Sequence, residues 1–145
     1  MKDMQFTVEI HASKETVWDV LWQDETFRQW AGLIDPGTYM VGELKVGNEV
    51  QFISAENGYG VTSLVEELVP NEFLLLRHSA DTKESGTKER ENEWTGGTES
   101  YELVEKKGGV TTLSVAFDVP EDMEEYFAGN YPKALDCIKL LAEAS

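Results

Sequence analysis

Few residues of this chain could do metal or acid–base chemistry. His11 and His78 are the only histidines, and Cys137 is the only cysteine. A zinc site needs several such ligands converging, and the chain contains no HxxH or HxxEH spacing that would bring them together. We therefore predict no metal ion and no cofactor, and we assign no catalytic residue.

Cys137 is a poor candidate for a nucleophile. It falls beside Ala134 and Ile138 in a segment with helical periodicity, where a small buried hydrophobe is the usual role of a free cysteine. The chain has no GxSxG elbow. The Gly58-Tyr59-Gly60 cluster lacks the lysine of a phosphate-binding loop, so we interpret it as a turn or strand bulge.

Arg77 and His78 end an apolar run, and the two-residue period of a strand sends them to opposite faces. Whichever side chain points inward must be paired or bound to a ligand. Glu93, Glu99 and Tyr101 follow later in the chain and could supply a partner. Two interpretations stay open: an internally satisfied pair or strand end, and a polar anchor for a ligand.

The first forty residues predict one strand and two short helices. Residues Met4 to His11 alternate apolar and polar side chains, which is typical of a half-buried strand. Ser13 suits a helix N-cap, and a second helical piece covers Glu25 to Ala31. Three tryptophans of these helices are expected to pack in the core: Trp18, Trp22 and Trp30.

A run of strands should follow the turn at Asp35-Pro36-Gly37. The predicted strands are 46–54, 59–69 and 73–79, and then a pair joined by a hairpin at Lys107-Gly108-Gly109. Residues Asp81 to Glu93 contain no apolar side chain and predict a solvated loop.

Residues Glu121 to Ala144 predict a long C-terminal helix after Pro120. Gly129 and Pro132 interrupt its pattern, so we expect a kink or a short break there. Its apolar face is Met123, Phe127, Tyr131, Leu135, Ile138 and Leu141, with Tyr126 beside it. Because strands run consecutively without βαβ alternation, the class is α+β with an antiparallel sheet, in a single domain over residues 1–145.

The chain is strongly acidic, with a net charge of −16 from 12 basic and 28 acidic residues. That charge disfavours nucleic acids and anionic membranes as partners, and leaves a basic protein partner open. No run reaches 18 apolar residues and no apolar signal region starts the chain. One cysteine allows no intrachain disulfide, and we expect a cytoplasmic protein.

Several motifs carry a resemblance to a known family. The strand is followed by Ala12-Ser13-Lys14-Glu15-Thr16-Val17-Trp18 and then by Phe27-Arg28-Gln29-Trp30-Ala31-Gly32, and residues 109–115 precede the last helix. Over nearly its whole length the chain resembles the START-like (helix-grip, SRPBCC) superfamily. Within it, the chain is similar to homologues of the activator of a heat-shock chaperone ATPase.

The resemblance implies a helix-grip fold. A curved sheet of about six or seven strands would wrap around the C-terminal helix and enclose a cavity used for hydrophobic ligands, catalysis or partner binding. Aromatic side chains could fill this space or line it. Our predicted ligand-binding residues are Phe52, Arg77, His78, Trp94, Tyr101, Leu113, Phe117, Tyr126, Phe127 and Tyr131.

Three functions remain as hypotheses. We favour a non-enzymatic domain that binds a small hydrophobic or amphipathic ligand between sheet and helix. The alternatives are a protein-interaction module of the chaperone-activator kind, and a cyclase- or hydrolase-type enzyme that uses His78 or a pocket carboxylate such as Glu99 as its acid or base.

Overall fold

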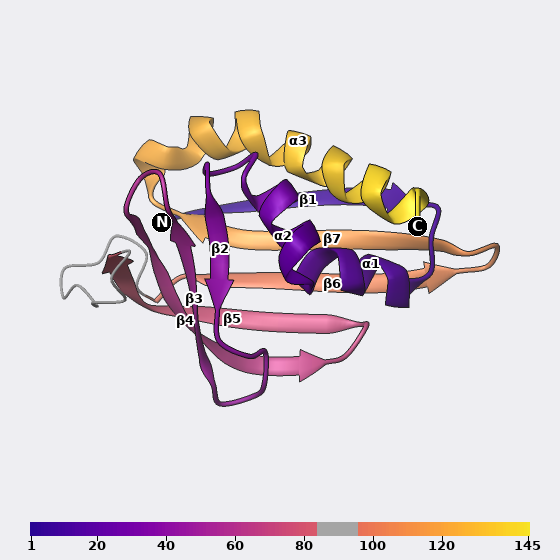
Figure 1. Cartoon of the computed structure of the whole chain (residues 1–145), viewed down its shortest axis with the longest axis horizontal. Coiled ribbons are helices and arrows are strands. Elements are labelled where there is room, and N and C mark those ends of the chain that lie inside the picture. Colours follow the sequence, from indigo (N-terminus) through magenta and orange to yellow (C-terminus); the bar gives the residue numbers. More distant parts are fainter. Residues whose placement is uncertain (84–95) are drawn as a thin grey trace.

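The residues described by the computed structural model, 1–83 and 96–145, contain seven strands that form one antiparallel sheet around a long helix (Figure 1). The strand order is β1-β7-β6-β5-β4-β3-β2. The predicted α+β helix-grip architecture is confirmed. The elements are β1 (Lys2–Ile10), α1 (Lys14–Trp22), α2 (Asp24–Ala31), β2 (Thr38–Val41), β3 (Glu49–Ser54), β4 (Tyr59–Val69), β5 (Phe73–Lys83), β6 (Thr98–Lys106), β7 (Val110–Val119), the 3-10 turn η1 (Glu121–Met123) and α3 (Glu124–Glu143).

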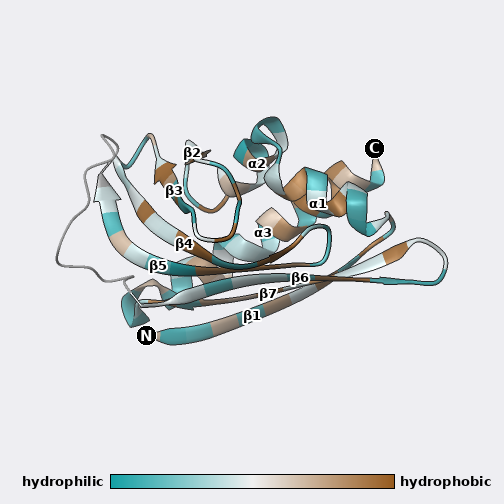
Figure 2. Ribbon diagram, turned by 90° about the horizontal axis from the view of Figure 1, so that it is seen from below, coloured by the Kyte–Doolittle hydropathy of each residue, from teal (hydrophilic) through white to brown (hydrophobic). Residues whose placement is uncertain are grey.

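The α-helices lie together on one side of the curved sheet (Figure 2). Between helices and sheet lies a core in which Leu21, Leu76, Leu113 and Ile138 are fully buried. Burying each such side chain stabilises the fold by about 1.5–3 kcal/mol. The Ser13 hydroxyl accepts a hydrogen bond from the Thr16 amide, which confirms the predicted N-cap of α1. Among the described helices, none is both long enough and apolar enough to cross a lipid bilayer.

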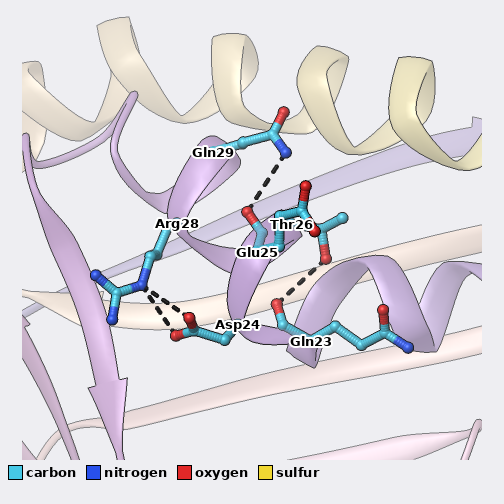
Figure 3. Close-up of polar contacts among 6 residues, drawn as sticks. All are labelled: Gln23, Asp24, Glu25, Thr26, Arg28 and Gln29. Atoms are coloured by element: carbon cyan, nitrogen blue, oxygen red, sulfur yellow. Dashed lines mark hydrogen bonds and ion pairs between the residues drawn. The ribbon is translucent and has the colours of Figure 1, made fainter.

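Helix α2 is polar outside and aromatic inside. On its outer side the Arg28 guanidinium donates to the Asp24 carboxylate at 2.9 Å, one turn away (Figure 3). The same guanidinium lies 5.3 Å from the ring centroid of Tyr39 in β2. The inner side buries Phe27 and Trp30. The helix is thereby held against β2 with its aromatic residues directed beneath α3.

Three strands differ from the sequence-based expectation: one was not predicted, and two have other boundaries. The short edge strand β2 (Thr38–Val41) was missed, because its half-buried residues show no clear alternation. β3 begins at Glu49, whereas we expected a strand from residue 46. β5 continues through Lys83, so the first residues of the predicted 81–93 loop are strand; the remainder of that loop lies outside the described residues.

Helix α3 runs from Glu124 to Glu143 with Pro132 inside it, so the predicted short break is wrong. A proline in a helix removes one backbone hydrogen bond and crowds the preceding turn. Burial of Tyr131, Ala134 and Leu135 around it offsets this cost and holds the helix against the sheet.

Two glycines give a matched test of this packing. A Cβ at Gly60 in β4 would clash with the Phe52 carbonyl oxygen and lie 2.7 Å from the Ile53 Cα, whereas a Cβ at Gly129 in α3 meets nothing within 4 Å. We expect Gly60→Ala to lower the free energy of unfolding by about 2 kcal/mol or more, because backbone must shift. Gly129→Ala should raise it by about 0.5–1 kcal/mol. Urea denaturation measures both, and equal stability of the two variants would contradict the register of β3 and β4.

Candidate functional site

A cavity of about 540 Å³ lies between the sheet, α2 and the N-terminal half of α3. This volume is typical of ligand pockets, which range over roughly 300–1,000 Å³. The interior at this end is therefore hollow, while the C-terminal half of α3 covers the packed core. The apolar walls of the cavity include Phe27, Trp30, Phe52, Val61, Phe117 and Phe127.

Most of the predicted ligand-binding residues meet in this cavity. They are Phe52, His78, Tyr101, Phe117, Tyr126, Phe127 and Tyr131. Two others lie elsewhere. Leu113 is fully buried in the packed core, and Arg77 lies on the other face of β5, where its Nε donates to Glu66 Oε1 at 2.9 Å. Neither belongs to the cavity wall, and Trp94 lies outside the described residues.

Two tyrosines and a carboxylate form the central polar group of the cavity. The Tyr101 hydroxyl donates to the Glu99 carboxylate, and the Tyr131 hydroxyl lies 3.4 Å from the Tyr101 hydroxyl. Since Tyr101 uses its one proton on Glu99, Tyr131 must be the donor in the second bond. Burial raises the pKa of the Glu99 carboxyl, and the hydrogen bond from Tyr101 offsets part of that effect. Burial and the nearby Glu99 raise the pKa of both phenols, which stay protonated at neutral pH.

His78 presents a neutral imidazole to the cavity. Its side chain is 3% exposed, and its Nδ1 lies 2.7 Å from the Ser63 hydroxyl of β4. Burial lowers the pKa of His78 to about 4, and the charge of Asp118 opposes this only weakly. Ser63 of the neighbouring strand β4 is thus a partner of His78 that the sequence analysis did not name; of the partners suggested there, Glu99 and Tyr101 are bonded to each other and Glu93 lies outside the described residues.

Asp81 lines the cavity although sequence reasoning placed it in a loop. The register of β4 and β5 shifts between Thr62 and Ser63, so that Ser63 faces His78 while Thr62 faces Ala80. This bulge inserts Ser79 and changes which face the following residues occupy. Asp81 therefore shares the cavity side with His78, three positions earlier. Strict alternation would have placed the two on opposite faces.

Asp35 is a second acidic residue of the cavity wall that the sequence analysis did not predict there, because it interpreted Asp35 only as part of the Asp-Pro-Gly turn. Burial raises the pKa of its carboxyl, while the hydrogen bond from the Asn57 side chain lowers it. Close by, the Tyr126 hydroxyl donates to the Ile34 carbonyl and joins α3 to the loop after α2. Asn57 and Tyr126 are exposed, so the cavity opens to solvent at this end.

The polar groups of the cavity can take part in hydrogen bonding and proton exchange, and its aromatic walls offer apolar contact. Carboxylates accept, phenols donate, and the imidazole does either according to its tautomer. Within residues 1–83 and 96–145, no three His, Cys, Asp or Glu side chains are grouped so that they could hold a metal ion.

A family model described as activator of Hsp90 ATPase homolog 1-like protein matches residues 11–143. The chain belongs to this family. The match covers the capped first helix and the last helix, and it confirms the resemblance noted from the sequence. A comparison with curated proteins gave no significant match.

Several solved structures share the fold of this chain. The solution structure of the Aha1 dimer from Colwellia psychrerythraea is similar with a TM-score of 0.75 and 18% identity, over 99% of this chain and 97% of that one. A Mesorhizobium loti protein has a TM-score of 0.74 and 15% identity, over 99% and 98%. A conserved Enterococcus faecalis protein of unknown function has a TM-score of 0.69 and 19% identity, over 97% of this chain and 71% of that one.

The buried imidazole predicts a dependence of stability on pH. Between pH 6.5 and about 4 the unfolded chain binds a proton at His78 that the folded chain does not, so acidification favours unfolding. The unfolding free energy of the wild type minus that of His78→Gln should therefore grow as pH rises through this window, in total by on the order of 3 kcal/mol. Denaturation at several pH values measures it. Glu99 and Asp35 have raised pKa values and change the stability in the opposite direction, but they do so in both proteins, so the difference in unfolding free energy cancels their contributions. A difference that does not change with pH would contradict the prediction.

Proposed function

We propose that this chain binds a small amphipathic molecule between the sheet and α3. The observation that carries the proposal is the cavity of about 540 Å³, in which aromatic walls surround a few converging polar groups. Protein interiors are normally close-packed, with few voids larger than a water molecule. An open volume of this size is therefore better explained by an occupant than by imperfect packing.

The composition of the wall supports a mainly apolar ligand. The rings of Phe27, Phe52 and Phe117 can remove apolar surface from water, which contributes roughly 25 cal/mol for each Å². The carboxyl of Glu99 and the hydroxyls of Tyr101 and Tyr131 lie together and can fix one polar end of the ligand. A small molecule with a polar end and an apolar body satisfies both features.

The contacts of the polar groups favour binding over catalysis. Tyr101 is bonded to Glu99, and His78 to Ser63, on a neighbouring strand. A general acid or base has to reach the reacting atom of its substrate. Groups that are already held by one another are suited to orienting a ligand, so we rank the enzyme hypothesis below the binding hypothesis.

Two valines of the same strand provide the test. Val61 lines the cavity, whereas Val69, at the end of β4, is 47% exposed and outside it. Titration with the neutral fluorescent dye Nile red should give saturable binding to the wild type. Val61→Phe should weaken this binding by about tenfold or more, which is about 1.4 kcal/mol, because the new ring occupies the cavity.

Val69→Phe is the matched control and should bind the dye as the wild type does. The proposal fails if the wild type shows no saturable binding, or if both phenylalanine variants bind the dye equally well. Native mass spectrometry of the purified protein adds an independent readout, since a retained ligand would appear as a mass increment lost in Val61→Phe.

A protein-interaction module is the second candidate function. Membership of a family described by an Hsp90 ATPase activator favours it, and the net charge of −16 would suit a basic surface on the partner. The ATPase rate of a purified Hsp90-type chaperone, measured with and without this chain at low and high salt, tests it. We expect a stimulation that salt weakens; unchanged rates with no binding at low salt would reject this function.

A further inference from the structure

We infer that the cavity selects an amphipathic organic cation, such as an alkyl or aryl amine, over an anion of the same size. This inference rests on the proposed binding function and adds the charge of the ligand to it. It is derived from the charged groups of the wall, from the rings around Glu99 and from the charge at the mouth.

The charged groups of the described wall have one sign. Asp35, Asp81 and Glu99 line the cavity, and among the side chains described for residues 1–82 and 96–145 no lysine or arginine lines it. His78 adds no positive charge at neutral pH, because burial holds its pKa at about 4. A fatty acid or another organic anion would therefore meet the carboxylates of Glu99 and Asp35, which are hydrogen-bonded to the uncharged side chains of Tyr101 and Asn57. An ammonium group would meet groups of opposite charge.

The surroundings of Glu99 suit a cation in particular. Glu99 in β6 is paired in register with Phe117 of β7, and the Phe117 ring lies 4.6 Å from the ring of Tyr131 and 5.6 Å from that of Phe127. A cation over an aromatic face is attracted by the ring quadrupole, by about 0.5–1 kcal/mol when exposed and by about 2 or more when desolvated. The Glu99 carboxylate accepts from Tyr101 in a cavity that these rings line, and it is thus a suitable site for an ammonium group.

The electrostatic cost of the buried carboxylate points the same way. Burial disfavours the ionised form of Glu99 and raises its pKa. A bound ammonium group would stabilise the carboxylate, so that part of the cost of burial is recovered when the cation enters. A bound anion would instead increase the repulsion and drive Glu99 toward its protonated form.

The mouth of the cavity adds to this preference. Asp35 lies there beside the exposed Asn57, and the chain as a whole carries a net charge of −16. A cleft lined by one sign of charge raises the local concentration of counter-ions and speeds their entry. Cations are therefore favoured both on approach and at the bottom of the cavity.

Displacement of Nile red by three probes with the same alkyl chain tests the inference. The probes are decylamine, decanol and decanoate, used below their micelle concentrations at neutral pH and physiological ionic strength, where the Debye length is about 8 Å. We expect decylamine to displace the dye at concentrations about tenfold or more below those of decanoate, with decanol between them. This comparison needs only the wild-type protein.

Two variants identify the group responsible. Glu99→Gln removes the carboxylate from the cavity, and Glu102→Gln removes one from the exposed outer face of the same strand. The ratio of decylamine to decanol affinity should fall about tenfold in the first variant and keep its wild-type value in the second. Equal falls in both would assign the effect to overall charge and overturn the inference.

The two proposals fail in different ways. If Nile red binds in the cavity and decanoate displaces it as well as decylamine does, cation selection is wrong and ligand binding stands. A wild-type ratio that persists in Glu99→Gln likewise overturns the role given to this carboxylate. If neither the dye nor any of the three probes binds, the proposed function fails and the charge preference fails with it.

Discussion

The position of Tyr131 is the constraint on which both halves of the structure depend. Its ring lies 5.3 Å from Phe6 and 4.6 Å from Phe117, and its hydroxyl faces that of Tyr101. Toward the C-terminus of α3, Ala134 and Ile138 are fully buried in the packed core; toward the N-terminus, the helix lines the cavity. Tyr131 therefore belongs both to the packed core and to the cavity wall. A shift of this residue would alter the packing of the core and the shape of the cavity.

Under the proposed function, folding stability and ligand binding depend on different ends of one helix. Domains are stable by only about 5–15 kcal/mol, and an unfilled volume forfeits packing energy. Here the complete burial of Val17 and Leu21 of α1 against the sheet and the end of α3 offsets that loss. Helix α2 contributes Trp30 to the cavity wall. The Trp30 Nε1 donates to the Leu21 carbonyl at 3.2 Å, and this bond links the cavity wall to the buried residues of α1.

Local patterns predicted the fold well where one face of an element is buried. The alternation of Met4 to His11, which became β1, and the Ser13 cap are examples, because burial and capping leave a direct mark on residue order. β2 was missed because a short, half-buried edge strand carries little alternation. The break expected at Pro132 failed for the opposite reason: the local proline rule was sound, and tertiary burial of its neighbours outweighed it.

Local sequence patterns were also insufficient to predict every residue of the cavity wall, including one of its charged residues. Period two correctly separated Arg77 from His78, but the bulge at Ser79 reset the alternation and brought Asp81 inside. A bulge depends on the partner strand, so one strand's sequence does not reveal it. The net charge of −16 was used above only to weigh classes of partner, and salt screens the exposed carboxylates that make up most of it. Glu99 differs by its position: it is half-buried in an aromatic cavity, where water and salt screen its charge less than on the surface, and for this reason the proposed preference for a cation rests on this one carboxylate.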